Sequence, residues 1–263
     1  MESRIPRQVA ALAAVALAGS AWAVKVPTQD DFSTPGLNRA LWIESEQGRF
    51  VQAKQLRLGR FTYGGAASDS GLVADTFNEP LIDTTAPKSM GADITVVDVK
   101  TDETCAANPF NTNARVRLIA AYFNQRPGGP VPGDRTGDVL AQIRLGRLSD
   151  TTLPAGQVDV QGILSTCSNA DCSASTAIGV VNFAPVALGT KVISRVDWAK
   201  KAKTFDFTAN GVTQTVSYTG SSATPPVLGF VQPSIRNEVA NCLSTPKVKA
   251  GIVADFDNVR FSY

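Results

Sequence analysis

Apolar and polar residues alternate with a period of two along several short segments of this chain. The alternation is clear over Gln55–Phe61, Asp93–Val99, Arg115–Phe123, Val139–Leu145 and Val158–Leu164. Successive side chains of a strand point to opposite faces, so the pattern predicts strands with one buried and one solvated face. The spacing of about 3.6 residues that marks an amphipathic helix is scarce. The sequence therefore predicts an all-β fold, either a sandwich or a barrel.

Turn signals separate these predicted strands. Pro127–Asp138 is a Pro/Gly-rich loop, and Ser149–Gly156 contains another break. Within Thr204–Tyr218, two alternating runs flank Asn210-Gly211, a pair preferred by the tight turns of β-hairpins. No internal repeat or linker-like tract divides the chain, so we expect a single β domain.

Composition excludes several classes of function. The chain has 263 residues, 25 Lys and Arg, 23 Asp and Glu, a net charge of +2 and no histidine. This balance does not suit a nucleic-acid-binding protein. The absence of histidine excludes Ser-His-Asp and Cys-His catalysis and every His-ligated metal centre.

The N-terminal residues have the features of a signal peptide. Arg4 and Arg7 precede the apolar run Val9–Ala18, and Ala21-Trp22-Ala23 matches a small-residue cleavage site. The run is shorter than the ~20 residues that cross a bilayer. We therefore predict a signal peptide over residues 1–23 and one domain over residues 24–263. The expected protein is secreted or periplasmic and does not span the membrane.

Four cysteines predict two disulfides in an oxidising compartment, and three pairings are open to them. Cys167 and Cys172 enclose Ser-Asn-Ala-Asp, a turn-forming tetrapeptide, which favours a local bridge. The predicted set is Cys167–Cys172 with Cys105–Cys242. A four-cysteine zinc site is the alternative, but the spacing lacks the paired C-x2-C signature.

The two ends of the chain carry a recognisable pattern. Its parts are Asp30–Ser33, Asn38–Trp42, Lys54–Leu58, Val196–Trp198, Lys203–Phe207, Asn210-Gly211 and Ala254–Arg260. This pattern resembles the concanavalin A-like lectin/glucanase (laminin-G-like) superfamily, and it is similar to secreted bacterial members. The resemblance implies a jelly roll, a two-sheet antiparallel β-sandwich whose first and last strands lie side by side. It also implies carbohydrate binding on the concave sheet.

The catalytic motif of the neighbouring glucanases is missing. Glycoside hydrolases of this class use paired carboxylates in an E-x-D-x-E strand, and no such stretch exists in this chain. Glu44 and Glu46 share one face of a predicted strand near Trp42, although a solvated strand face is the far commoner meaning of such a pair. The sequence leaves enzyme activity open and favours its absence.

Polar residues form stripes on three predicted strands. Arg115 and Arg117 lie on one strand face, Gln142 and Arg144 on a second, and Asp159 and Gln161 on a third. If these strands are neighbours, the stripes merge into a surface whose planar donors suit hydroxyls or carboxylates. The alternative is the water-facing side of an antiparallel sheet. Tyr63 and Tyr122 are further candidates for stacking on a sugar, against packing in the core or at its rim.

A structural calcium is implied by the resemblance. The matching positions are the Asp257 side chain with the backbone carbonyls of Asp31 and Lys54. Oxygen ligands of this kind suit calcium.

Taken together, these features predict a secreted, non-catalytic, lectin-like protein whose partner is a glycan or polysaccharide. A glycan-cleaving hydrolase or lyase with atypical catalytic residues is one alternative. A structural or adhesive surface protein is another.

Overall fold

The structure is a computed structural model that describes residues 46–80, 86–243 and 247–263. These residues belong to one compact unit, Ser45–Tyr263. The predicted signal peptide, Asp31, Trp42 and Glu44 lie outside the described residues. Glu46, the other member of the candidate catalytic pair, is the first residue of a described strand.

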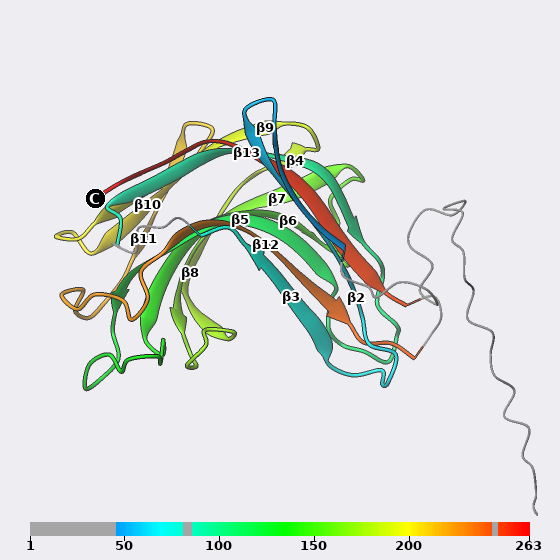
Figure 1. Cartoon of the computed structure of the whole chain (residues 1–263), viewed down its shortest axis with the longest axis horizontal. Coiled ribbons are helices and arrows are strands. Elements are labelled where there is room, and N and C mark those ends of the chain that lie inside the picture. The colour runs from blue at the N-terminus through cyan, green and yellow to red at the C-terminus, as the bar shows by residue number, and fades with distance from the viewer. Residues whose placement is uncertain (1–45, 81–85, 244–246) are drawn as a thin grey trace, which may run out of the picture. The chain divides into compact units, whose positions relative to one another are not determined.

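Thirteen strands form two antiparallel sheets in the described part of the chain (Figure 1). The seven-stranded sheet has the order β1 (Glu46–Gln52), β2 (Gln55–Tyr63), β13 (Lys249–Ser262), β4 (Ser89–Thr101), β9 (Lys191–Ala199), β10 (Thr204–Ala209) and β11 (Val212–Ser217). The six-stranded sheet has the order β3 (Leu72–Asn78), β12 (Val231–Ala240), β5 (Asn113–Asn124), β6 (Asp138–Leu148), β7 (Gln157–Cys167) and β8 (Ser175–Ala187). The predicted all-β, two-sheet antiparallel sandwich is confirmed. No helix occurs in the described ranges, so none there is long and apolar enough to span a bilayer.

Each segment predicted from alternation lies within a strand. The five segments correspond to β2, β4, β5, β6 and β7. The hairpin of β10 and β11 turns at Asn210 and Gly211, which both have positive φ angles of 49° and 82°. This is the backbone geometry that a two-residue hairpin loop of this type requires.

Strands from the two ends of the described chain pair directly. β13 runs antiparallel to β2 from Lys249 to Phe256, with Ala254 opposite Leu58 and Phe256 opposite Leu56. β13 also pairs with β4 on its other side. The expected juxtaposition of early and late strands is therefore confirmed for Lys54–Leu58 and Ala254–Arg260.

The core lies between the two sheets and is rich in aromatic side chains. Tyr122 from the six-stranded sheet makes an edge-on contact with Phe205 from the seven-stranded sheet, with ring centroids 4.8 Å apart. Trp198 also packs edge-on against Tyr122 and donates a hydrogen bond from Nε1 to the Tyr218 hydroxyl at 3.0 Å. Offset and edge-on arrangements are those that aromatic quadrupoles favour. Phe205 and Phe207 are fully buried, as the alternation predicts.

Both predicted disulfides are present. Cys105 is bonded to Cys242, and Cys167 to Cys172. No cysteine is free, so the four-cysteine zinc alternative is wrong. Asp69 lies near Cys105 and Cys242, but a disulfide offers no thiolate, so this group does not make a metal site.

Candidate functional site

The six-stranded sheet curves so that its concave face points away from the seven-stranded sheet (Figure 1). A cleft of about 720 Å³ follows this face. Its floor consists of outward-facing side chains of β12, β5, β6 and β7, and the loop after Cys167 and the strand β8 form one side. A cleft of this size is large enough to hold several monomer units of an oligomeric ligand.

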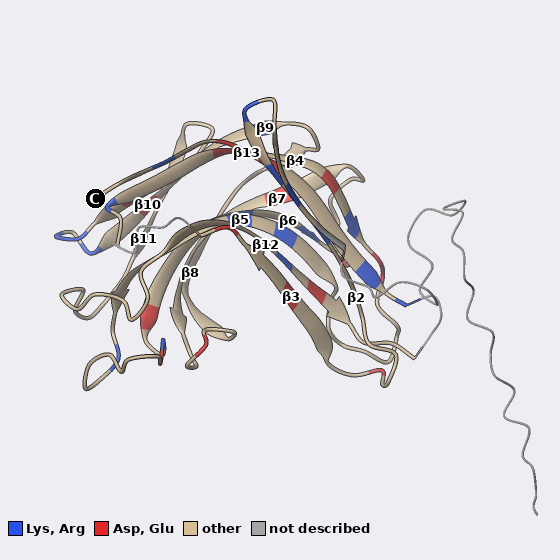
Figure 2. Ribbon diagram, in the orientation of Figure 1, with Lys and Arg blue, Asp and Glu red and all other residues tan. Residues whose placement is uncertain are grey.

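The predicted polar stripes do merge on this sheet, because β5, β6 and β7 are consecutive neighbours. In the strand register, Arg117 lies opposite Arg144, and Arg144 lies opposite Gln161. One row further along, Ile119 lies opposite Gln142. Figure 2 shows basic positions along β5 and β6 of the six-stranded sheet.

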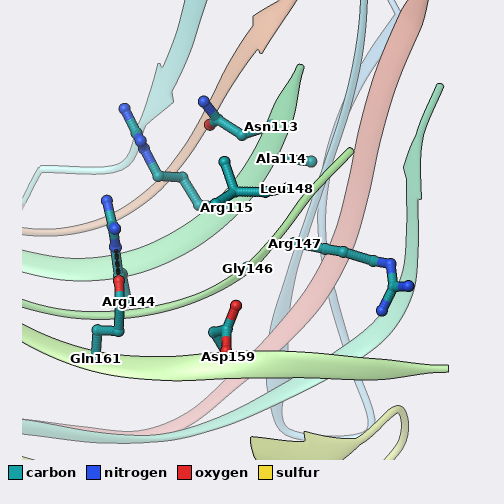
Figure 3. Close-up of a pocket in the computed structure, with 9 residues that line it drawn as sticks. All are labelled: Asn113, Ala114, Arg115, Arg144, Gly146, Arg147, Leu148, Asp159 and Gln161. Carbon is teal, nitrogen blue, oxygen red and sulfur yellow. Dashed lines mark hydrogen bonds between the residues drawn. The ribbon is translucent and has the colours of Figure 1, made fainter. Parts of the chain in front are cut away.

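A small recess of about 50 Å³ adjoins the cleft and shares two of its arginines. Figure 3 shows Arg115 and Arg144 extending from neighbouring strands, with Gln161 held against Arg144 and Asp159 on the same side. The Gln161 Oε1 atom accepts a hydrogen bond of 2.7 Å from Arg144 Nε. Arg147 points away from the other side chains in this view. The recess therefore brings Asp159 and Gln161 beside the cleft.

Cationic side chains outnumber anionic ones along the cleft. Five arginines line it, against two carboxylates. The arginines are Arg115, Arg117, Arg135, Arg144 and Arg236, and the carboxylates are Asp171 and Glu238. The whole chain carries a net charge of only +2, so the positive charge is concentrated at this site. Such focusing of one sign of charge in a cleft raises the local concentration of ligands of the opposite sign.

At one end of the cleft, the carboxylate of Glu238 holds three neighbouring side chains by hydrogen bonds. Its oxygens accept hydrogen bonds from Arg115 Nη2 at 2.6 Å, Arg236 Nε at 2.8 Å and Asn113 Nδ2 at 2.7 Å. Burial acts to raise the pKa of Glu238, but the two guanidinium groups and the amide outweigh it, so the pKa is lower than that of an ordinary glutamate. Glu238 is therefore ionised at neutral pH, and its charge is already balanced by protein groups.

Unlike Arg115 and Arg236, the side chains of Arg117 and Arg144 are not paired with a carboxylate among the described residues. Arg117 Nε donates to the Ser234 hydroxyl at 3.1 Å, and Arg144 Nε donates to Gln161. Within the described residues, no ion pair joins either guanidinium to a carboxylate. Burial together with the nearby Arg115 charge lowers the pKa of Arg117 to about 9 and that of Arg144 to about 10. Both side chains therefore keep their positive charge at pH 7. They lie side by side on the neighbouring strands β5 and β6 of the cleft floor.

Two buried polar atoms in the cleft also lack a hydrogen-bond partner among the described residues. They are Gln142 Oε1, an acceptor on the floor, and Arg135 Nη2, a donor near one end. Buried polar groups in proteins are normally satisfied by protein, water or ligand atoms. Their positions identify where an added hydroxyl or carbonyl group could bind.

The two tyrosines predicted as sugar-stacking candidates do not join this site. Tyr122 is 1% exposed and packs in the aromatic core between the sheets, so the prediction that it faces a ligand is wrong. Its position on the apolar face of β5 explains this, because alternate residues of a strand share a face. Tyr63 is at the end of β2 in the seven-stranded sheet, opposite Lys249, and is not among the residues that line the cleft.

The strand β12 supplies cleft residues that the sequence pattern did not single out. Gln232, Arg236 and Glu238 of β12 line the cleft beside β5, and Arg236 lies opposite Arg115 in the register. Pro233 within this strand pairs with Leu118. A proline normally argues against a strand between two neighbours, which hid this segment. The alternation of its polar residues was the signal that could have identified it.

The described positions implied for calcium are close in the fold, and the ammonium group of a lysine lies near their carboxylate. The register places Asp257 beside the turn that contains Lys54, as the resemblance implies, and Asp31 lies outside the described residues. However, the Lys191 ammonium lies 3.8 Å from an Asp257 carboxylate oxygen and 3.4 Å from Asp93. The negative charge of this group is thus already balanced by a side-chain cation. Because Asp31 lies outside the described residues, the calcium site itself stays a prediction.

Comparisons with known proteins find similar solved structures at low TM-scores and low identity. No protein-family model and no curated protein matches the chain. Among solved structures, the carbohydrate-binding module CBM66 from Bacillus subtilis matches at a TM-score of 0.34 and 8% identity, covering 84% of this chain and 94% of that one. The family 7 alginate lyase A1-II' matches at a TM-score of 0.41 and 13% identity, and the match covers 81% of this chain and 83% of the lyase. A Bacillus licheniformis β-glucanase matches at 0.33 and 11%, covering 78% of each chain.

The two-sheet sandwich of this chain is established by its own strand pairing and not by these matches. At these TM-scores and identities, the similarity assigns neither an activity nor a ligand to this chain.

Proposed function

We propose that this protein is an exported, non-catalytic recognition protein that binds acidic carbohydrate chains in the cleft of the six-stranded sheet. The observation that carries the proposal is the pair Arg117 and Arg144. They lie opposite each other on the cleft floor, are largely desolvated, and have no carboxylate partner among the described residues.

Desolvated like charges are costly unless an opposite charge neutralises them. A carboxylate on the ligand supplies that charge, and a guanidinium group can bind it through two parallel N–H···O bonds. Glu238 does not serve this purpose, because it is already bonded to Arg115 and Arg236. The site therefore suits a ligand with repeated carboxylates, such as a polyuronic acid, better than a neutral glucan.

Hydroxyl groups of a sugar would complete the polar contacts. Gln142 lies one register row beyond Arg144 on the same face of β6, and its buried Oε1 has no donor among the described residues. A hydroxyl of the sugar chain is a suitable donor for this atom. An acidic glycan offers both the carboxylates and the hydroxyls that this floor lacks.

Export is part of the same proposal. The two disulfides are consistent with an oxidising compartment such as the periplasm or the extracellular space. Carbohydrate polymers with carboxylates occur in such compartments as matrix and wall material, which gives the cleft a ligand within reach.

The cleft chemistry also favours binding over glycoside hydrolysis. A glycosidase needs one carboxylic acid that donates a proton and one carboxylate nearby. Glu238 is kept ionised by three donors, and the pKa of Asp171 is lowered by hydrogen bonds from the backbone and side chain of Ser173. Neither group is set up as a proton donor at neutral pH.

A polysaccharide array tests this proposal. The purified mature protein is applied to acidic and neutral polysaccharides of matched length, beside an Arg117→Gln/Arg144→Gln variant. The control is Arg49→Gln/Arg195→Gln, which removes the same charge from exposed arginines of the seven-stranded sheet.

We expect binding to acidic polymers that falls at least tenfold in the cleft variant, because each charge-assisted hydrogen bond contributes about 1.5–3 kcal/mol. The control should bind within twofold of the wild type. Equal binding of neutral polymers, or unchanged binding by the cleft variant, overturns the proposal. Release of new reducing ends or unsaturated products from the same polymers would establish cleavage instead.

A further inference from the structure

One end of the cleft is apolar, in contrast to its arginine-lined floor. Ile119, Leu140, Ile163, Val180 and Phe230 line this part, which we call the apolar end. Four of them belong to the six-stranded sheet, and Ile163 lies directly opposite Val180 in the register of β7 and β8. The rows with Arg117 and Ile119 are two residues apart along β5, or about 7 Å.

The apolar end is separate from the main core. Ile119, Leu140 and Phe230 form a second hydrophobic cluster with Ala121 and Cys167, and Cys172 packs against it. The main core lies between the sheets and contains other side chains of the same strands. The second cluster is therefore built on the concave face. Ile119, Leu140 and Phe230 are 3%, 6% and 7% exposed there, and Val180, at 46%, is the exposed residue of the apolar end.

Its composition is unusual for a surface that contacts bare sugar rings. Sugar rings stack their C–H faces on flat aromatic rings, and the apolar end has Phe230 as its one aromatic residue among the cleft-lining residues described. The branched side chains of Ile119, Ile163 and Val180 form a concave aliphatic surface instead. Such a surface fits a small alkyl group, because aliphatic contacts depend on shape and buried area and not on ring geometry.

The guanidinium group of Arg135 lies at the apolar end of the cleft. The Arg135 guanidinium lies over the Phe230 ring, with its central carbon 5.0 Å from the ring centroid. Its Nε contacts Asp138 at 3.5 Å, and its buried Nη2 has no hydrogen-bond partner among the described residues. The apolar end thus combines aliphatic side chains, of which Val180 is the exposed one, with one unused N–H donor.

We propose that the apolar end binds short acyl esters, chiefly O-acetyl groups, carried by the acidic glycan. The acetyl methyl packs against Ile119, Ile163 and Val180, and the acetyl carbonyl accepts a hydrogen bond from Arg135 Nη2. Esterifying a hydroxyl leaves the uronate carboxylate free, so Arg117 and Arg144 keep their anionic partner. This inference rests on the proposed function and specifies its ligand as an O-acetylated polyuronic acid.

Matched polymers test the inference. Polygalacturonate, polyglucuronate, polymannuronate and polyguluronate are each prepared in a chemically O-acetylated form and in the same form after mild alkaline de-O-acetylation. Binding of the full mature protein is measured by calorimetry. Removal of the acetyl groups should weaken binding to the preferred polymer about fourfold for each acetyl group in the cleft, which is the change in Kd that corresponds to burying one methyl group.

Two variants locate the effect. Val180→Thr keeps the side-chain volume but replaces a methyl with a hydroxyl at the apolar end, and Arg135→Leu removes the donor. Both should reduce the ratio of the two Kd values toward one. For Val180→Thr, binding to the deacetylated polymer should stay within twofold, whereas Arg135→Leu also removes one of the five cleft charges and should weaken binding to both forms of the polymer. Val97→Thr is the matched control, because Val97 is a similarly exposed valine on the seven-stranded sheet. It should leave the ratio unchanged.

The outcomes separate the two proposals. If none of the polymers binds in either form, the proposed function is wrong, and this inference falls with it. If a polymer binds equally well with and without acetyl groups, the acidic-glycan proposal stands and the acetyl inference alone is overturned. Because the readout is a ratio of affinities in one protein sample, a variant that is partly unfolded still gives a decisive value.

Discussion

The two disulfides close loops of very different length, which predicts very different contributions to stability. Cys105 and Cys242 are 137 positions apart, whereas Cys167 and Cys172 are 5 positions apart. In the chain-entropy treatment, the long loop contributes about 5 kcal/mol to the free energy of unfolding and the short loop about 2 kcal/mol. We expect Cys105→Ser/Cys242→Ser to lose more than twice as much stability as Cys167→Ser/Cys172→Ser.

The native structure around the long bridge should survive its removal. Asn108 donates hydrogen bonds from Nδ2 to the carbonyl oxygens of Gly71 at 2.9 Å and Asn241 at 2.8 Å, which holds the same chain segments together. The loss should therefore come from the larger freedom of the unfolded chain. Distortion of the folded state should contribute little.

Equilibrium unfolding in guanidinium chloride, followed by tryptophan fluorescence, measures both losses. The variants are compared at equal protein concentration with the wild type in its oxidised form. Equal losses, or a larger loss for the short bridge, would refute the loop-closure reasoning. A larger loss for the short bridge would indicate that it instead stabilises the folded cleft wall, of which Cys172 is part.

Three further predictions follow from single side chains. Gly162→Ala should lower the free energy of unfolding by about 1–3 kcal/mol, because a Cβ there would lie 2.5 Å from the buried Phe207 ring. Gly48→Ala is the control: the nearest atom to a Cβ at Gly48 is 3.7 Å away, so this variant should change stability little. Tyr122→Phe should leave stability unchanged or raise it, because the buried hydroxyl has no partner among the described residues; a loss above about 1 kcal/mol would show that the hydroxyl is bonded. The folded-state pKa of Glu238 is below its ordinary value of 4.5, so its contribution is complete above pH 4.5 and is lost as the pH falls through the lower folded pKa. Unfolding curves of the wild type should therefore fall more steeply with pH below 4.5 than those of Glu238→Gln, and parallel curves would contradict this assignment.

Local alternation was sufficient to predict much of the fold. The segment Val158–Leu164 became part of β7, and the Asn210-Gly211 turn formed the expected hairpin, because both features depend on residues close in sequence. The pairing of the cysteines was also predictable, since a short turn between Cys167 and Cys172 leaves one partner for each of the others.

The parts of the site that escaped prediction depend on residues distant in sequence. Glu238 and Arg236 come from β12, which becomes a neighbour of β5 only in the folded sheet. Ile119 lies in a run where both strand faces are apolar, so alternation alone could not reveal that it faces the cleft. The calcium positions matched a local pattern, but Lys191 approaches Asp257 from another strand and supplies the charge that the pattern omits.

The position of a bound acidic glycan tests the central claim most directly. The protein is titrated with a uronic acid hexasaccharide while the side-chain Nε–H signals of its arginines are followed by NMR spectroscopy. We predict that the signals of Arg117 and Arg144 shift together and saturate with one Kd, while those of Arg49 and Arg195 stay unchanged. Shifts confined to the seven-stranded sheet, or no shift at saturating hexasaccharide, would contradict the account.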